Sequence, residues 1–192
     1  MQSSNNLFPV FLKLENLRLL IVGGGYVGME KLQAVISNSP ATIITIVALQ
    51  ISDAIKEVAK QYPGITLSEK KYTADDLAGH DIVIAAINDP GISKQVVEDA
   101  NCKKILVNAA DKPELCDFYL GSVVKKGNLK IAISTNGKSP TIAKRVKEFL
   151  NNALPEEIDE LLDNMESIRN KMSGDFTEKV KQLNEITKTL SK

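Results

Sequence analysis

The chain has 192 residues, of which 43% are hydrophobic and 25% charged, a composition typical of a soluble globular protein long enough for one full domain plus an appendage. Its 24 basic and 24 acidic residues cancel, so no net charge favours nucleic acid or a membrane surface as a partner. No apolar run approaches the roughly 18 residues of a membrane span, and no basic segment followed by an apolar stretch opens the chain, so we expect a cytoplasmic protein.

The first predicted unit is a strand, a turn and a helix. Residues 17–22 read LRLLIV, an apolar, branched run that stops at Gly23-Gly24-Gly25. Such a run is typical of a buried strand that enters a tight turn. Apolar residues at helical spacing follow until Asn-Ser-Pro at residues 38–40 ends the helix, and they are Val27, Leu32, Val35 and Ile36.

This pattern of strands and helices continues to residue 110. The sequence predicts strands at 41–49, 65–72, 81–87 and 104–110, and helices at 51–62 and 90–101. Strands that alternate with helices at this spacing indicate right-handed crossovers. We therefore predict an α/β fold with a Rossmann-type doubly wound parallel sheet.

The pattern changes after residue 111. Two β-rich runs surround Lys126-Gly127-Asn128 and predict a hairpin. Ser139-Pro140 predicts the start of a helix that ends near residue 154, and two more apolar stripes at helical spacing flank Ser173-Gly174. We expect three segments: the Rossmann domain at 1–113, a hairpin and helix at 114–154, and a small C-terminal helical region at 155–192.

Glycines at 23, 25 and 28 satisfy the GxGxxG pattern between a predicted strand and a predicted helix. The first glycine permits the turn, the second lets the backbone approach a pyrophosphate, and the third allows the helix to pack closely on the strand. The free amides of the helix would meet the phosphates. The residues assigned to this part of the cofactor site are Gly23, Gly24, Gly25, Tyr26, Val27 and Gly28.

The second predicted strand ends without the Asp or Glu that usually binds the adenosine ribose. Leu49 and Gln50 stand there, and Asp53 lies further along. Gln50 or backbone groups could hold the ribose, and because no arginine waits there for a 2′-phosphate, we expect NAD rather than NADP. Ala86, Asn88 and Asn108, which lie at the carboxyl ends of later strands, complete the expected cofactor contacts.

Several longer blocks resemble the precorrin-2 dehydrogenases of the sirohaem pathway. They are FPVFLKLENLRLLIVGGGYVGMEKL from residue 8, AAINDPGISKQV from 85, NAADKPELCDF from 108 and ISTNGKSP from 133. The resemblance covers residues 8–154 and implies NAD-dependent oxidation of precorrin-2 to sirohydrochlorin in sirohaem or cobalamin biosynthesis. It also implies a homodimer formed through the hairpin and the helices that follow it. Because no tetrapyrrole methyltransferase domain follows residue 154, we expect no fused multifunctional enzyme.

The resemblance also implies a role for Asp111, which follows the fifth predicted strand. Its carboxylate could accept a substrate proton; alternatively it caps a turn before Lys112-Pro113. Precorrin-2 carries several carboxylates, so Thr135, Lys138 and Arg145 are expected to bind substrate, although charged residues on a helix are often only solvated.

Other functions stay open at this point. A family member can also insert iron into sirohydrochlorin, and a glycine turn also fits a regulatory module that senses NAD. Cys102 and Cys116 form no CxxC pair, and His80 is the only histidine, so we expect neither a disulfide framework nor a metal site. Thus the sequence favours an NAD-dependent dehydrogenase with a tetrapyrrole substrate.

Overall fold

The computed structural model describes residues 5–110, 112–173 and 175–187. The chain divides into two compact units, Met1–Leu120 and Gly121–Lys192. The first unit is built on a five-stranded sheet, and the second on a two-stranded sheet followed by helices. Residues from 121 onward thus group together, and the finer division at 113 and 154 stays a prediction.

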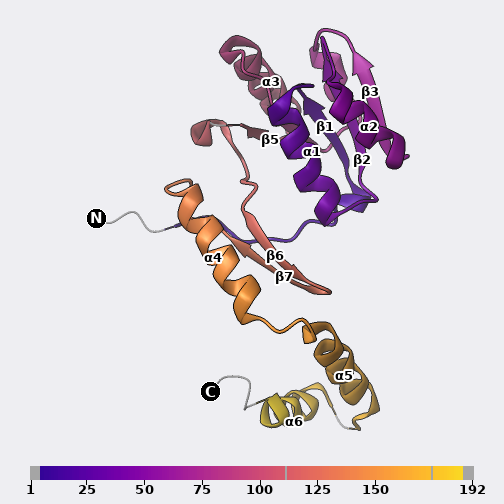
Figure 1. Ribbon diagram of the computed structural model, residues 1–192, viewed down its shortest axis with the longest axis vertical. Coiled ribbons are helices and arrows are strands. Elements are labelled where there is room, and N and C mark those ends of the chain that lie inside the picture. Colours follow the sequence, from indigo (N-terminus) through magenta and orange to yellow (C-terminus); the bar gives the residue numbers. More distant parts are fainter. Residues whose placement is uncertain (1–4, 111, 174, 188–192) are drawn as a thin grey trace. The chain divides into compact units, whose positions relative to one another are not determined.

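The sheet of the first unit is entirely parallel. Its strand order is β3-β2-β1-β4-β5, so the chain moves outward from β1 in one direction and then returns to build the other half (Figure 1). This arrangement confirms the predicted doubly wound sheet. The strands are β1 (Arg18–Val22), β2 (Ile43–Ala48), β3 (Ile65–Glu69), β4 (Ile82–Ala85) and β5 (Leu106–Ala109).

Helices cover both faces of this sheet. Alternate residues of β1 point to opposite faces, so Leu19 and Ile21 belong to one buried cluster and Leu20 and Val22 to the other. The helices α1 (Tyr26–Asn38) and α2 (Asp53–Gln61) pack on the first cluster, and α3 (Pro90–Lys103) packs on the second. Each fully buried Leu or Ile side chain contributes about 1.5–3 kcal/mol of hydrophobic stabilisation.

Short 3₁₀ helices and capping bonds fix the connections of the first unit. The 3₁₀ helices are η1 (Leu14–Asn16), η2 (Ala74–Leu77) and η3 (Pro113–Leu115). At η2, Asp76 accepts from the Thr73 backbone N–H at 2.9 Å, which is one half of a capping box. At α3, Asp89 Oδ1 accepts from the backbone N–H groups of Gly91 and Ile92 at 2.8 and 3.1 Å.

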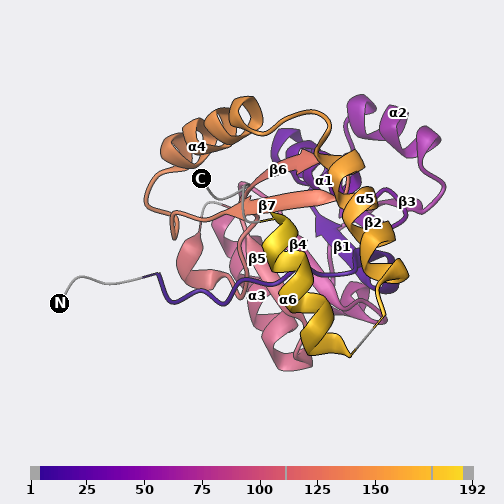
Figure 2. The same ribbon diagram turned by 90° about the horizontal axis from the view of Figure 1, so that it is seen from below.

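The second unit contains the predicted hairpin and helices. Strands β6 (Ser122–Lys126) and β7 (Leu129–Ile133) pair antiparallel. Ser139 caps α4 (Pro140–Ala153) by accepting from the Ile142 backbone N–H at 3.2 Å, as the sequence predicted. The helices α5 (Ile158–Lys171) and α6 (Phe176–Thr187) follow (Figure 2).

The hairpin turn is fastened to the start of α5. Asp159 Oδ1 accepts from the backbone N–H of Asn128 at 2.7 Å and from its side-chain amide at 3.0 Å. Lys126 forms an ion pair with Glu156. These contacts tie α5 to the hairpin within one unit.

The helices of the described part of the chain are all too short or too polar to cross a bilayer.

Candidate functional site

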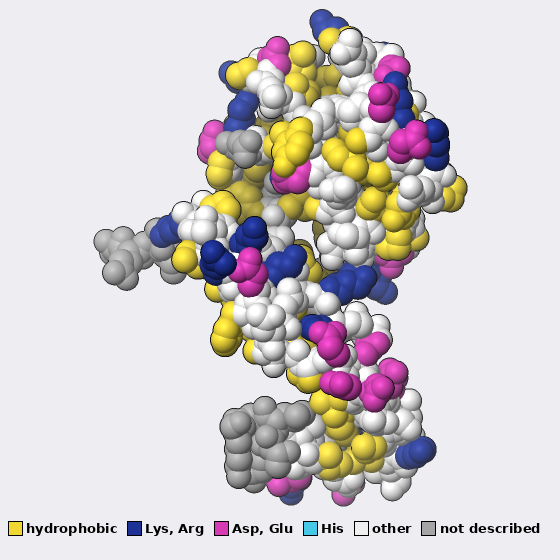
Figure 3. Space-filling view, in the orientation of Figure 1, with side chains coloured by type: hydrophobic (Ala, Val, Ile, Leu, Met, Phe, Trp, Pro, Cys, Tyr) yellow, Lys and Arg dark blue, Asp and Glu magenta, His cyan; other side chains and the backbone are white. Residues whose placement is uncertain are grey.

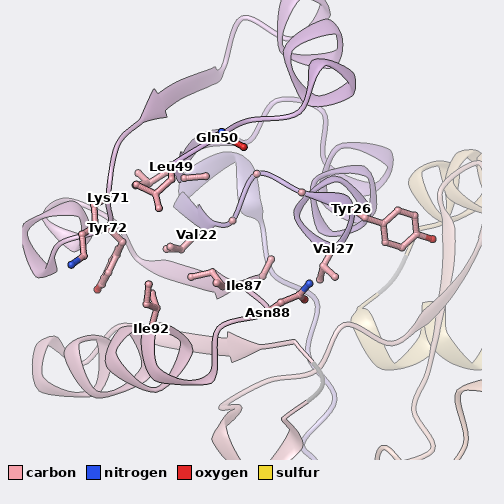
Figure 4. A pocket seen from close by; sticks show the side chains of 16 residues that line it. Val22, Tyr26, Val27, Leu49, Gln50, Lys71, Tyr72, Ile87, Asn88 and Ile92 are labelled. Carbon is pink, nitrogen blue, oxygen red and sulfur yellow. The ribbon is translucent and has the colours of Figure 1, made fainter.

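A pocket of about 430 Å³ opens at the carboxyl ends of β1, β2 and β4 (Figure 4). In parallel α/β sheets ligands bind at this edge, where the strand order reverses. Here that point lies between β1 and β4. The described residues that line the pocket are Val22, Gly23, Gly24, Gly25, Tyr26, Val27, Val47, Ala48, Leu49, Gln50, Lys71, Tyr72, Ala86, Ile87, Asn88 and Ile92.

The first two glycines of the turn are required by the fold. Gly23 has φ +130°, a conformation that residues with a side chain rarely adopt, and a β-carbon there would collide with the backbone carbonyl of Ala86. The backbone N–H of Gly23 donates to the Val47 carbonyl at 2.9 Å, which ties the turn to β2. A β-carbon on Gly24 would likewise collide with the carbonyl of Gln50. The turn is therefore tightly packed between the residues that follow β2 and those that follow β4.

Gly25 differs from its neighbours because, apart from the residues next to it in the chain, no described atom lies within 4 Å of where its β-carbon would be. Its backbone is extended (φ −94°, ψ −157°), so the fold does not demand glycine at this position. Gly25 caps α1 without a side-chain hydrogen bond, and the first turn of α1 contains no acidic residue. The first N–H groups of a helix have no partner within it, and they favour an anion. This open cradle fits the pyrophosphate of a dinucleotide.

Gly28 lies behind the turn and does not line the pocket. A β-carbon at this position would collide with the carbonyl of Gly23 and would lie 3.8 Å from Ile55. Gly28 therefore lets α1 approach the turn closely, which is the packing task that the sequence pattern predicted. Even alanine would require the backbone to shift here.

The far end of the pocket lies beside Leu49 and Gln50, with Lys71 and Tyr72 on the same side and Ile92 below them (Figure 4). Tyr72 is buried, and its hydroxyl donates to Asp99 at 3.2 Å. Burial raises the pKa of Tyr72, and the nearby Asp99 carboxylate adds to this, so the phenol is neutral. Sequence reasoning missed Lys71 and Tyr72, although their place at the end of the strand predicted over 65–72 was a signal that they reach the ligand edge.

The other end of the pocket holds Val27 and Asn88 (Figure 4). Asp89 is occupied in capping α3, so Asn88 is the polar side chain available beside the turn. Tyr26 is 83% exposed, and its ring points away from the pocket. The structure thus gathers nine of the eleven residues expected to bind the cofactor, the exceptions being Gly28 and Asn108; that they bind it stays a prediction.

Asn108 is buried within β5 and does not line the pocket. Its side-chain amide donates to the Phe118 carbonyl at 2.8 Å and to the sulfur of Cys116 at 3.5 Å. This geometry gives no support to a cofactor contact, because the amide group fastens the segment after β5 to the strand. Cys116 also connects this segment to β5, since its thiol lies 3.2 Å from the Ala109 carbonyl and 3.3 Å from the Lys112 carbonyl.

The predicted substrate residues belong to the second unit. Asp111 falls outside the described residues. Thr135 exchanges hydrogen bonds with the backbone of Ser139 at 3.1 and 3.2 Å, which closes the turn before α4. Lys138 follows in that turn, and Arg145 pairs with Glu148 at 2.8 Å on the exposed side of α4. These three residues belong to the second unit, and their role in substrate binding stays a prediction.

Together, the sheet order, the glycine turn and the open cradle at the start of α1 define a Rossmann-type dinucleotide-binding domain. The comparisons agree with this class. The chain belongs to the NAD(P)-binding family whose model matches residues 10–122, more than half of its length. A second family model, described as sirohaem biosynthesis protein central, matches residues 126–153.

Known relatives confirm the resemblance seen in the sequence. The chain is 35% identical to the siroheme synthase of Psychrobacter sp. (strain PRwf-1), over 92% of this chain and 34% of that protein. It is 32% identical to the siroheme synthase of Methylococcus capsulatus, over 91% of this chain and 34% of that protein. The chain therefore spans about a third of the length of these relatives.

The solved structure of SirC, precorrin-2 dehydrogenase, matches with a TM-score of 0.74 and 27% sequence identity. The match covers 94% of this chain and 89% of that one. Both units of the present chain are therefore represented in the match. The similarity in fold thus extends well beyond the dinucleotide-binding domain.

Proposed function

We propose that this chain catalyses the NAD-dependent oxidation of precorrin-2 to sirohydrochlorin in sirohaem or cobalamin biosynthesis. The observation that carries the proposal is the open cradle at Gly25, with a pocket running to both sides of it, in a chain similar over nearly its whole length to a precorrin-2 dehydrogenase. NAD, when bound, accepts a hydride from the substrate, and a proton leaves the macrocycle. The reaction is a two-electron oxidation, and NADH is released.

Within this proposal, the residues of the pocket bind and orient the cofactor. The turn at residues 23–25 and the first amides of α1 hold the pyrophosphate. Leu49, Tyr72 and Ile92 provide apolar contacts at one end of the pocket, which suits the adenine ring. Val27 and Asn88 lie at the other end, and Asn88 would orient the nicotinamide through its side-chain amide. This end would meet the macrocycle.

The test is an anaerobic assay of the purified chain with precorrin-2 and NAD, followed by NADH absorbance. The proposal expects one NADH for each sirohydrochlorin formed. Binding of NAD without NADH formation would instead favour the sensory module. Efficient iron insertion into sirohydrochlorin by the same protein would add the chelatase activity that the sequence leaves open.

We assign the proton-accepting role to Asp111. In the sequence it comes two residues after the end of β5, and ligands of parallel α/β sheets bind beyond the carboxyl ends of the strands. Asp111→Ala should reduce turnover by about 10²–10⁴-fold, the usual contribution of a general base, and leave NAD affinity within about twofold. Steady-state rates and calorimetric NAD titrations measure both. Full turnover by the variant would remove Asp111 from the mechanism.

A homodimer formed through the second unit is part of the proposal. On α4, the apolar side chains of Ile142, Val146 and Phe149 lie three and four residues apart and are 55%, 38% and 69% exposed. Residues at this spacing form one stripe on a helix. A second copy of the chain is the partner that the family resemblance implies for this stripe. The cytoplasmic location stays a prediction, which cell fractionation would test.

A further inference from the structure

The adenosine end of the pocket contains a cation and no anion. Among the described residues that line the pocket, Lys71 is the one with a charged side chain. Leu49 and Gln50 take the place after β2 where NAD-specific domains carry an acidic residue, which binds the ribose hydroxyls and repels a 2′-phosphate. The usual barrier to NADP is therefore missing.

The carboxylate at the end of β3 is occupied. Glu69, at the end of β3, forms an ion pair with Lys56 at 2.9 Å and accepts from the Ile51 backbone N–H at 3.0 Å. The Lys56 ammonium group and the Ile51 amide together lower the pKa of Glu69, so it is ionised and held in place. Neither Glu69 nor Asp53 lines the pocket.

Lys71 differs from Lys70 and Lys56 in that its charge is not paired within the described part of the chain. Lys70 is paired with Asp76 at 2.5 Å and Lys56 with Glu69. Within the described part of the chain, the ammonium group of Lys71 has no hydrogen bond or ion pair, and the side chain is exposed at the pocket rim beside Tyr72 (Figure 4). Its flexible four-carbon stem can direct the charge to a phosphate near the ribose.

We propose that Lys71 allows this pocket to accept the 2′-phosphate of NADP, so that the chain uses NADP as well as NAD. The inference rests on the proposed function, because it assumes that a dinucleotide occupies the pocket with its adenosine beside Tyr72. It differs from the expectation drawn from the end of the second strand alone, which considered only an arginine at that place. Lys71 reaches the same end of the pocket from the segment that follows β3.

Calorimetric titration of NAD and NADP into four proteins tests the inference: wild type, Lys71→Gln, Gln50→Glu and the control Lys60→Gln. Lys60 is an exposed lysine on α2, paired with Glu57 outside the pocket, so its loss matches the change in net charge. Wild type should bind both nucleotides with dissociation constants within about tenfold of each other. Lys71→Gln should weaken NADP about three- to tenfold and NAD less than twofold, as expected for an exposed pair with phosphate.

Gln50→Glu restores the missing carboxylate and should weaken NADP at least about tenfold relative to NAD. The effect of Lys71→Gln should shrink at high salt, because the charge is solvent-exposed. Lys60→Gln should change neither affinity. Binding of NAD alone by the wild type, or an equal loss of both nucleotides in Lys71→Gln, would overturn the inference and leave the proposed function standing. Failure of the wild type to bind either nucleotide would defeat both.

Discussion

The two units of the chain differ in how much of their apolar surface they cover themselves. In the first unit, central strand residues such as Leu20 and Ile21 are completely buried between helices on both faces. In the second unit, the buried hydrophobic residues are Val124 and Ala143 among those described, and α5 and α6 bury none. Hydrophobic side chains are visible on the surface of its helices (Figure 3). The first unit has its own core, whereas the described part of the second unit buries few of its apolar side chains.

The largest effect should come from changing the most tightly packed point of the first unit. Gly23→Ala adds a β-carbon at φ +130° against the Ala86 carbonyl, so we expect it to lower the free energy of unfolding by about 3 kcal/mol or more. Urea unfolding measures this loss. The matched control is Gly25→Ala, where open space should limit the change to about 1 kcal/mol. Equal losses in both variants would contradict the packing described for the turn.

The second unit should respond in its assembly rather than in its fold. Phe149→Glu places a charge in the exposed stripe of α4, so we expect the dimer to dissociate while the helix content is unchanged. Light scattering at micromolar concentration measures the mass, and circular dichroism checks the fold. Lys147→Glu, on the same helix but outside the stripe, is the control. A wild-type protein that is already monomeric would defeat the proposed dimer.

A smaller effect is expected in the alkylation rates of the two cysteines, both of which belong to the first unit. Cys102 is exposed, whereas Cys116 is half-buried and its thiol donates to the Ala109 carbonyl at the end of β5. Burial raises the pKa of the Cys116 thiol, so less of the reactive thiolate is present at neutral pH. Iodoacetamide should therefore label Cys102 at least about tenfold faster, as followed by mass spectrometry. Equal rates would contradict the burial and hydrogen bonding described for Cys116.

Most of the fold could be predicted from local patterns. The alternating strands and helices, the hairpin around Gly127 and the cap at Ser139 each have a signal within a few residues. The glycine turn was predicted for the same reason. Lys71 and Tyr72 were missed because they approach Leu49 and Gln50 only when β3 pairs with β2, which is a contact between distant parts of the chain. The position of Asn108 at a strand end does not reveal which way its amide group bonds, so its hydrogen bond to the Phe118 carbonyl could not be predicted from the sequence.

The most direct test of cofactor binding at the glycine turn uses Gly25→Asp, because this substitution fills the open cradle with a side chain and a negative charge. Apart from the adjacent residues, no described atom lies within 4 Å of the new β-carbon, so the thermal unfolding temperature should stay close to that of the wild type. Repulsion of the pyrophosphate should weaken NAD binding by about 100-fold, or roughly 2.7 kcal/mol. Calorimetric titration of the folded variant measures the affinity. The predicted result is a folded protein that hardly binds NAD, and unchanged affinity would contradict the placement of the cofactor at this turn.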